Sequence, residues 1–334
     1  MFFKERKLML TFAWLCVNHV IIDCFGMYFS PMHMSFETKD MNPTTLVPLE
    51  GIPNFRKLAP TSQLFRSAAM EKATPNDLEK LSEELGIRTV VDLRGDSERK
   101  SLSSCPLGDN FEVIRGDSVE FEISSSIPSS TRRCFHISLL EAERQYKGMY
   151  KRMNPPKKAA AVWWSLFSGR KETELYLQEI NNGGLETLYQ VILETSKAEI
   201  CQVLRIIADP TNHPLVFHCV KGKDRTGLVA MLVSHCLNTS KQDIISDYSV
   251  SWGLLEKHEA KHNDKSGERS QSRASKEKED KYPGIDWSKF KGTPPSVMES
   301  TISFIQSTYG SVDSYLDAIG FGSEWQKKLH DACR

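Results

Sequence analysis

Residues 218–227, HCVKGKDRTG, constrain this chain more than any other segment. The four residues 215–218 (LVFH) predict a short buried strand, and residues 226–237 predict a helix that is apolar on almost every side. A glycine-containing loop between a strand and a helix N-terminus is suited to hold an anion, because backbone N–H groups and the helix dipole converge there. The segment therefore predicts an anion-binding loop on an α/β scaffold.

The two ends of this loop carry the candidate chemistry, Cys219 and Arg225, in a Cys-x5-Arg spacing. The helix N-terminus and the nearby charges of Lys221 and Lys223 should stabilise a thiolate on Cys219 and make it the nucleophile. Arg225 offers a planar fork of donors that can bind two phosphate oxygens at once. Attack on a phosphate ester would give a thiophosphoryl intermediate, which water hydrolyses without a metal.

The other loop residues have predicted supporting roles. Gly222 and Gly227 permit the backbone to approach an anion closely. The Thr226 hydroxyl is expected to hydrogen-bond the sulfur as it leaves, and His218 to hold the loop rather than to act as an acid or base. The predicted phosphate-binding set is Val220, Lys221, Gly222, Lys223, Asp224 and Arg225.

The reaction also needs an acid that protonates the departing oxygen. Asp224, inside the loop, is the nearest candidate. Asp96 and Asp117 also lie in predicted loops and are alternatives if the fold brings them over the pocket. Aspartate is common in turns, so a purely structural role is the competing interpretation for these two.

Local signals elsewhere also indicate an α/β fold. Thr74 and Pro75 are typical of a helix N-cap and first turn, and a leucine stripe follows until Gly86. The β-branched run at residues 87–93 then predicts a strand. Further helices are predicted in residues 185–208, from about residue 239, and in residues 297–309 and 312–319.

The chain is expected to contain one domain, over residues 37–334. Residues 1–36 form an extension whose basic and apolar residues are compatible with a signal or membrane anchor, although the apolar run is shorter than the ~20 residues of a spanning helix. Residues 95–184 are a variable middle region that holds an insertion or a lid, and the charged residues 257–281 predict a solvated loop. We expect a cytoplasmic protein, with the signal or anchor as the alternative.

Composition excludes several classes of function. Acidic and basic residues number 43 each, so no global field favours binding to nucleic acid or to an anionic membrane, and any basic pocket must be local. The eight cysteines are scattered without a Cys-x-x-Cys pair, which argues against a zinc cluster and a disulfide scaffold. The histidines have no metal-ligand spacing, so we predict neither metal nor cofactor.

The loop resembles the HCxxGKDRTG signature of the atypical tyrosine-phosphatase-like family. Other stretches agree with the family in the expected order. They are Asn54-Phe55-Arg56, Phe65-Arg66-Ser67, Asp92-Leu93-Arg94 with Glu98, Asp247-Tyr248, and residues 309–312 with 315–316. The resemblance extends from about residue 49 to the C-terminus and departs from the family pattern at residues 57–59.

This resemblance implies a protein-tyrosine-phosphatase fold, with a mainly parallel central sheet flanked by helices, and hydrolysis through a cysteinyl-phosphate. It also implies that Asp224 is the acid. Arg66, Asp92 and Arg94 should line or brace the pocket, with a structural ion pair as the alternative.

The leading functional prediction is a phosphatase of the protein-tyrosine or dual-specificity type. A phosphoinositide phosphatase is an alternative, because Lys221 and Lys223 would favour a substrate with additional phosphates. A catalytically inactive phosphate-binding scaffold and a rhodanese-like sulfur transferase are the alternatives of other classes. The predicted partners are a phosphoprotein or phosphoinositide substrate, with membrane contact as a secondary prediction and no nucleic acid.

Overall fold

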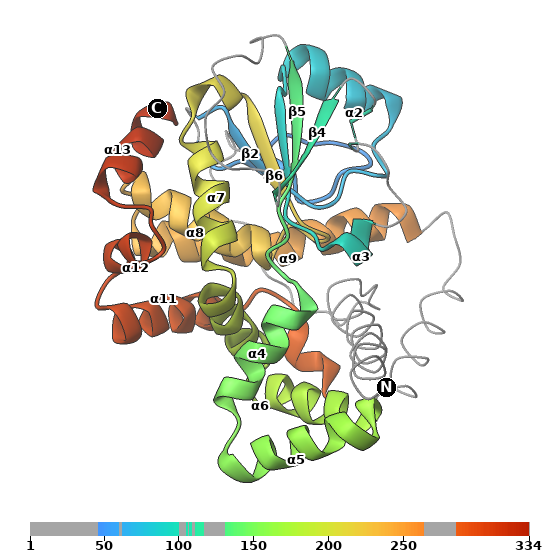
Figure 1. The fold of residues 1–334 in the computed structure, drawn as a ribbon. Coiled ribbons are helices and arrows are strands. Elements are labelled where there is room, and N and C mark those ends of the chain that lie inside the picture. Colours follow the sequence, from blue (N-terminus) through green and yellow to red (C-terminus); the bar gives the residue numbers. More distant parts are fainter. Residues whose placement is uncertain are drawn as a thin grey trace. The chain divides into compact units, whose positions relative to one another are not determined.

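The computed structural model describes residues 46–59, 62–99, 105, 107–108, 111–116, 131–263 and 285–333. A six-stranded sheet in the order β1-β2-β6-β3-β5-β4 is flanked by helices (Figure 1). β1 pairs antiparallel with β2, and the other neighbours pair parallel. The predicted α/β class with a mainly parallel sheet is thus confirmed. The strands are β1 (Arg56–Lys57), β2 (Leu64–Ser67), β3 (Thr89–Asp92), β4 (Phe111–Arg115), β5 (Arg132–His136) and β6 (Leu215–His218).

Helices and helical turns are interspersed with the strands along the chain. They are α2 (Pro75–Glu79), η1 (Lys80–Glu84), α3 (Asp96–Arg99), α4 (Ala142–Arg152), α5 (Pro155–Phe167), α6 (Gly169–Thr195), α7 (Lys197–Ile207), η3 (Pro210–Asn212), α8 (Arg225–Cys236), α9 (Lys241–Asn263), η4 (Trp287–Phe290), α11 (Pro295–Tyr309), α12 (Val312–Ala318) and α13 (Ser323–Ala332).

The predicted helix after Thr74 is present, and its cap explains where it begins. The Thr74 side chain accepts a hydrogen bond from the backbone N–H of Asp77, while the Asp77 carboxylate accepts one from the backbone N–H of Thr74. This reciprocal pair satisfies two N–H groups that have no partner within the helix. The helical turns end before Gly86, whose φ of 59° is left-handed.

The strand and helix that bracket the predicted anion loop lie where the sequence placed them. β6 covers residues 215–218, and α8 begins one residue before the predicted start. All four residues of β6 are buried, as are most side chains of α8, because a central parallel strand is covered on both faces. Val216 belongs to a core cluster with Phe65 and Val90 from the two neighbouring strands.

The register of the three central strands determines which residues share one edge of the sheet. His218, the last residue of β6, pairs with Ser67 at the end of β2 and with Asp92 at the end of β3. The residues that follow these three therefore leave the sheet side by side at its carboxyl edge. In parallel α/β sheets this edge is where ligands bind.

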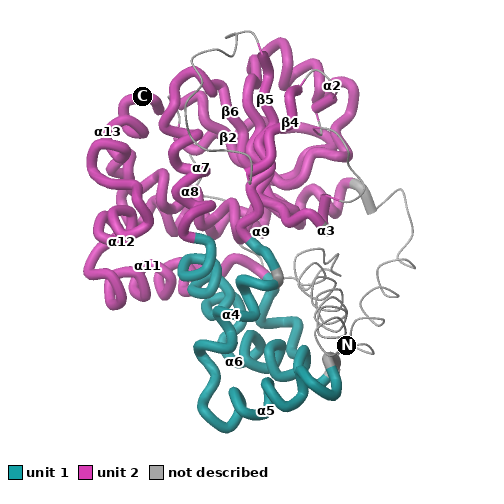
Figure 2. Tube along the Cα trace, in the orientation of Figure 1, with its two compact units in different colours: residues 1–33, 140–196, 262–291 teal, residues 34–139, 197–261, 292–334 magenta. Residues whose placement is uncertain are grey.

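The chain divides into two compact units, shown in different colours in Figure 2. One contains the sheet. The other contains residues 140–196, 262–263 and 285–291 of the described chain, and in it α4 and α5 each pack against α6. The variable middle region thus contains α3, β4, β5, α4, α5 and the start of α6. The prediction of one domain over residues 37–334 stays a prediction, and the predicted extension at residues 1–36 lies outside the described residues.

The predicted solvated loop at residues 257–281 needs a correction. Residues 257–263 are the last part of α9, and residues 264–281 lie outside the described residues. Lysine, glutamate and alanine in residues 257–261 are strong helix formers, so a charged composition does not exclude a helix there. Among the described helices, none is long and apolar enough to cross a bilayer.

Candidate active site

The candidate nucleophile lies at the centre of the sheet's carboxyl edge. Cys219 follows directly after β6, and its side chain is fully buried. The loop then turns into α8, whose first residue is the equally buried Arg225. The six described cysteines are all buried, and none of them forms a disulfide within the described part of the chain. Position after a strand and before a helix N-terminus therefore distinguishes Cys219 from the other five.

Gly222 is the position at which the loop requires glycine. Its φ is +68°, and a Cβ atom there would lie 2.3 Å from the carbonyl oxygen of Ser67. That distance is shorter than any van der Waals contact, and the obstacle is the backbone of β2, which cannot move aside as a side chain could. The loop therefore packs directly on the end of the neighbouring strand.

The carbonyl groups of the loop accept hydrogen bonds from neighbouring residues on the side of the loop that faces away from the predicted anion. The Val220 carbonyl accepts a hydrogen bond from the backbone N–H of Ala69 at 2.9 Å. The Asn54 side-chain amide donates to the carbonyls of Lys221 and Gly222 at 3.1 and 3.0 Å. Because the C=O and N–H of a trans peptide point in opposite directions, the N–H groups that follow these carbonyls point to the other side of the loop. Converging N–H groups of this kind make an anion site.

The Arg225 guanidinium is held by a carboxylate. Its two terminal nitrogens donate to the two Glu98 oxygens at 2.5 and 2.8 Å. Glu98 also accepts a hydrogen bond from the backbone N–H of Gly95 at 2.7 Å, which fixes it at the start of α3. Burial alone would lower the pKa of Arg225, but the Glu98 charge raises that pKa above its usual value. Arg225 is thus a permanently charged, oriented fork.

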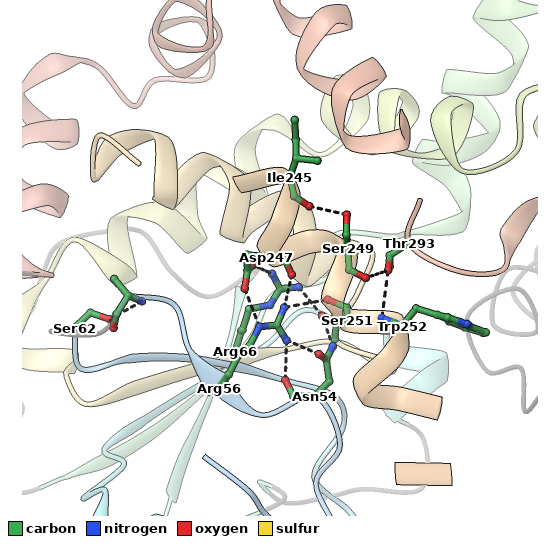
Figure 3. Close-up of polar contacts among 12 residues, drawn as sticks. Asn54, Arg56, Ser62, Arg66, Ile245, Asp247, Ser249, Ser251, Trp252 and Thr293 are labelled. Atoms are coloured by element: carbon green, nitrogen blue, oxygen red, sulfur yellow. Dashed lines mark hydrogen bonds and ion pairs between the residues drawn. The ribbon is translucent and has the colours of Figure 1, made fainter. Parts of the chain in front are cut away.

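A second arginine network lies behind the loop (Figure 3). Arg66 donates to the Gly222 carbonyl at 2.8 Å and forms an ion pair with Asp247 of α9. Arg56 binds the same carboxylate at 2.8 Å, and it also hydrogen-bonds Asn54. Burial and the Arg56 charge lower the pKa of Arg66 to about 10. Arg66 therefore contacts the back of the loop, and its role there stays a prediction.

Asp92 and Arg94 form the structural ion pair that the sequence left as an alternative. The Arg94 Nε lies 2.9 Å from one Asp92 oxygen, and a further nitrogen lies 2.8 Å from the other. Burial alone would raise the pKa of Asp92, but the neighbouring cationic groups hold it well below its usual value. Arg94 also pairs with Glu71.

His218 is fully buried beneath the loop. Its Nδ1 lies 3.1 Å from the Cys219 carbonyl oxygen, and burial lowers the pKa of the ring below its usual value. Its Nε2 has no hydrogen-bond partner in the described residues. These contacts favour the predicted role of holding the loop. Gly227, one turn into α8, packs against the Tyr248 ring, where a Cβ would come within 3.2 Å.

The candidate acid and the hydroxyl that follows it are both buried. Asp224 is the N-cap residue of α8, and its carboxylate lies 3.4 Å from Lys223 Nζ. Within the described chain, the buried Oγ1 of Thr226 lacks a hydrogen-bond partner. The Nζ atoms of Lys221 and Lys223 lie 5.8 and 5.7 Å from the Trp252 ring centroid, so two cations and an aromatic ring adjoin the loop.

The two alternative acids lie elsewhere or outside the described chain. Asp96 is 82% exposed and forms an ion pair with Arg99 at 2.7 Å. Asp117 lies outside the described residues. Where the structure is described, no group of three or more His, Cys, Asp or Glu side chains is arranged to hold a metal ion.

Four residues of this arrangement, Asn54, Arg56, Glu98 and Asp247, are not among the predicted site residues. They belong only to the stretches that resemble the family pattern. The one available signal for Glu98 was its place shortly after the strand that pairs with β6, because that strand ends at the same sheet edge. Asn54 and Asp247 have no such local signal.

Comparisons with known proteins find similarity to phosphatases. A sequence model of the tyrosine phosphatase family matches residues 47–333. A tyrosine-protein phosphatase of Nostoc commune is 26% identical over 134 residues, which are 40% of this chain and 44% of that protein. An inositol diphosphatase of Arabidopsis thaliana is 31% identical over 58 residues, 17% of this chain and 28% of that protein. The chain thus matches less than half the length of these two curated relatives.

Solved structures with a detectable likeness include the catalytic core of a PP-IP phosphatase from S. cerevisiae. One structure of this core, in complex with citrate, has 13% identity and a TM-score of 0.31, and the match covers 72% of this chain and 98% of that chain. A second structure of the core has 11% identity and the same TM-score, and the match covers 72% of this chain and 100% of that one.

Proposed function

Because the chain belongs to the tyrosine phosphatase family, we propose that it hydrolyses phosphate monoesters through a cysteinyl-phosphate on Cys219. The observation that carries the proposal is the loop itself. Its carbonyls are bound from behind by Ala69, Asn54 and Arg66, so its N–H groups face the other way, between Cys219 and the oriented fork of Arg225. A dianion is the ligand that such a cradle binds best.

The proposed first step is an in-line attack. The Cys219 thiolate forms a bond to phosphorus while the bond to the ester oxygen breaks, and Asp224 gives its proton to the departing alcohol or phenol. Arg225 binds two of the oxygens on which charge is spread in the transition state. A water molecule then attacks the phosphoryl group and passes a proton to Asp224. The Cys219 thiolate leaves, inorganic phosphate is released, and the Thr226 hydroxyl stabilises the sulfur.

The surrounding contacts support this mechanism because they fix the groups before substrate binds. Glu98 holds the Arg225 fork, and Asn54 and Arg66 hold the loop carbonyls. Preorganised donors need no rearrangement as charge develops, and this preorganisation is commonly the largest single contribution to catalysis.

A second candidate substrate class is an inositol ring that carries several phosphates. Lys221 and Lys223 beside Trp252 support it, because a second phosphate on the ring could bind a lysine while the first occupies the loop. The relative from Arabidopsis is named an inositol diphosphatase, which is further support. Phosphotyrosine and phosphoserine or phosphothreonine peptides remain the leading class, and the same lysines would bind their acidic flanking residues.

The first experiment measures phosphate release by the purified protein without added metal. The substrates are phosphotyrosine, phosphoserine and phosphothreonine peptides, a phosphoinositide panel and soluble inositol phosphates and diphosphates. We expect turnover that falls at least about a thousandfold in Cys219→Ser. The best substrate identifies the class. Turnover that survives in Cys219→Ser refutes the mechanism, and no turnover together with binding of a phosphate analogue assigns the chain to the scaffold alternative.

The acid is tested with the same assay. Asp224→Asn should lower kcat/KM, which reports formation of the cysteinyl-phosphate, about a hundredfold or more on an alkyl phosphate, whose leaving group needs a proton. It should lower kcat/KM much less on p-nitrophenyl phosphate, whose leaving group departs as an anion. The matched control is Asp317→Asn, which changes an exposed aspartate of α12 and should leave both rates unaltered. An equal loss on both substrates in Asp224→Asn would show that this residue is not the acid.

A further inference from the structure

The helix α5 presents an apolar face to solvent. Val162, Trp163, Leu166 and Phe167 are 53%, 59%, 48% and 64% exposed. They are four of the six large hydrophobic side chains exposed in the described residues. Their spacing places them on one side of the helix, and the rings of Trp163 and Phe167 contact each other with centroids 4.7 Å apart. We call these four residues the α5 apolar face.

The segment that carries this face is strongly basic. Residues 144–171 contain eight lysines and arginines and no aspartate or glutamate, in a chain whose charges balance at 43 each. Lys158 and Lys171 lie beside aromatic rings of the same segment, with Nζ 5.8 Å from the Tyr150 centroid and 3.9 Å from the Trp164 centroid. Three of the eight pair with glutamates outside this stretch, Lys147 with Glu143, Arg152 with Glu194 and Lys157 with Glu179. The positive charge that can attract an anionic surface is therefore carried by the other basic residues of the stretch, Lys151, Lys158 and Lys171 among them.

We propose that the α5 apolar face is a docking site for an anionic membrane surface. Helices that lie in the lipid headgroup region combine Trp, Phe and Leu on one face with Lys and Arg on the other. The aromatic rings enter the boundary between headgroups and acyl chains, while each basic residue is attracted to anionic lipids. The face and the phosphate loop share no residue and belong to different units of the chain, so the proposal holds whatever substrate the loop accepts.

Charge and size argue against protein occupants of this face. A second copy of the chain in a two-fold dimer would bring the same basic segment against itself, and like charges repel. A stable protein interface uses about 20–30 residues on each side, far more than the four side chains of the α5 apolar face. A membrane requires only that a few apolar side chains insert and that basic ones surround them.

The test uses the full chain and co-sedimentation with vesicles. One set contains phosphatidylcholine alone, and the other contains phosphatidylcholine with phosphatidylserine. We expect at least about tenfold tighter binding to the second set, weakened by salt. The double variant Trp163→Ser with Phe167→Ser should bind at least about tenfold more weakly, because two apolar side chains no longer insert. The matched control, Leu46→Ser with Leu78→Ser, removes two exposed leucines elsewhere and should bind like the wild type.

Charge-reversal variants distinguish attraction to anionic lipids from non-specific adsorption to vesicles. Lys151→Glu with Lys158→Glu should lose the preference for phosphatidylserine, whereas Lys241→Glu with Lys328→Glu, which changes exposed lysines elsewhere, should keep it. Hydrolysis of a soluble substrate should be unchanged in all four double variants, so a loss of membrane binding is distinct from a failure of the proposed activity.

Two results would overturn the proposal. One is wild-type protein that stays in solution with both vesicle sets. The other is vesicle binding that the Trp163 and Phe167 substitutions leave unchanged. If the wild type instead sediments as a dimer without vesicles, and those substitutions make it monomeric, the α5 apolar face is an interface between copies.

Discussion

At the scale of single residues, Gly222 and Gly86 have similar left-handed backbones but different surroundings. Their φ values are 68° and 59°. A Cβ at Gly222 would lie 2.3 Å from the Ser67 carbonyl oxygen, while one at Gly86 would have no atom within 4 Å. Alanine at either position adds backbone strain of about 1 kcal/mol or more. Only at Gly222 must it also displace the end of a central strand.

Gly222→Ala should therefore lower the free energy of unfolding by about 1–3 kcal/mol more than Gly86→Ala does. It should also lower kcat/KM at least about tenfold. The displaced loop carbonyls would lose their hydrogen bonds to Asn54 and Arg66, so the loop would no longer be held in position for the substrate. Urea unfolding and the phosphatase assay measure the two effects. Equal behaviour of the two glycine variants would mean that the contact with Ser67 relaxes at no cost.

Glu98 offers a second test at this scale, because it orients Arg225. Glu98→Gln keeps one acceptor oxygen and should lower kcat/KM about ten- to a hundredfold. Glu98→Ala leaves a buried arginine without its partner and should also lower the free energy of unfolding by about 3 kcal/mol. Glu143→Gln, in an exposed ion pair with Lys147, is the control and should change neither quantity. Full activity in Glu98→Ala would show that Arg225 is oriented by other contacts.

The residues that the sequence could identify differ from the others in a physical respect. Cys219 and Arg225 belong to one continuous loop, so their spacing alone brings them together. Glu98 meets Arg225 across 127 residues of chain, and Arg56 meets Asp247 across 191. Such contacts depend on strand order and register, which no local pattern contains. For the same reason the sequence left open whether Arg66 lines the pocket or braces it.

At the scale of elements, the sequence predicted best the helices and strands whose signal lies within a few neighbouring residues. The capping box of α2 and the apolar run of β6 are self-contained, and both elements form where predicted. The strand predicted at residues 87–93 is shorter, Thr89–Asp92, because its pairing with β5 and β6 extends over only four residues. α5 was not predicted, because its large apolar residues are confined to residues 162–167, a run too short to define a helical period.

The packing of α4 against α6 gives a prediction for these helices. A Cβ at Gly148 would lie 2.8 Å from the Thr195 methyl group and 2.9 Å from a Val191 methyl group. Glycine thus sets how closely the two helices approach. Gly148→Leu should lower the free energy of unfolding by about 1–3 kcal/mol through overpacking, measured by urea titration. Lys147→Ala, on the exposed side, should change it by less than about 0.5 kcal/mol. If Gly148→Leu keeps the free energy of unfolding of the wild type, α4 can move away from α6 without a loss of stability.

At the scale of the whole molecule, three paired carboxylates, two of them buried and one partly exposed, make the fold depend on pH. Asp247 joins Arg56 and Arg66, and Asp92 joins Arg94. Asp77 accepts hydrogen bonds from three backbone N–H groups. Burial opposes ionisation of all three, yet these partners lower the pKa of each carboxyl below its usual value. Asp247 connects β1 and β2 to α9, and Asp77 connects α2 to the backbone before β1.

The folded chain therefore releases protons from these carboxyls that the unfolded chain, with ordinary values near 3.9, still binds in mild acid. Their contribution to stability is present above about pH 4 and is lost as the pH falls through the lowered folded values. The urea midpoint should be nearly constant above about pH 5 and fall steeply below about pH 4. Asp77→Asn should lower the free energy of unfolding by about 1–3 kcal/mol at neutral pH. It should also make the fall of the urea midpoint in acid less steep, because one titrating group is gone. The control Asp317→Asn, at an exposed aspartate, should leave the pH dependence of the urea midpoint unchanged. If the midpoint of Asp77→Asn falls in acid as steeply as that of the wild type, other groups govern acid unfolding.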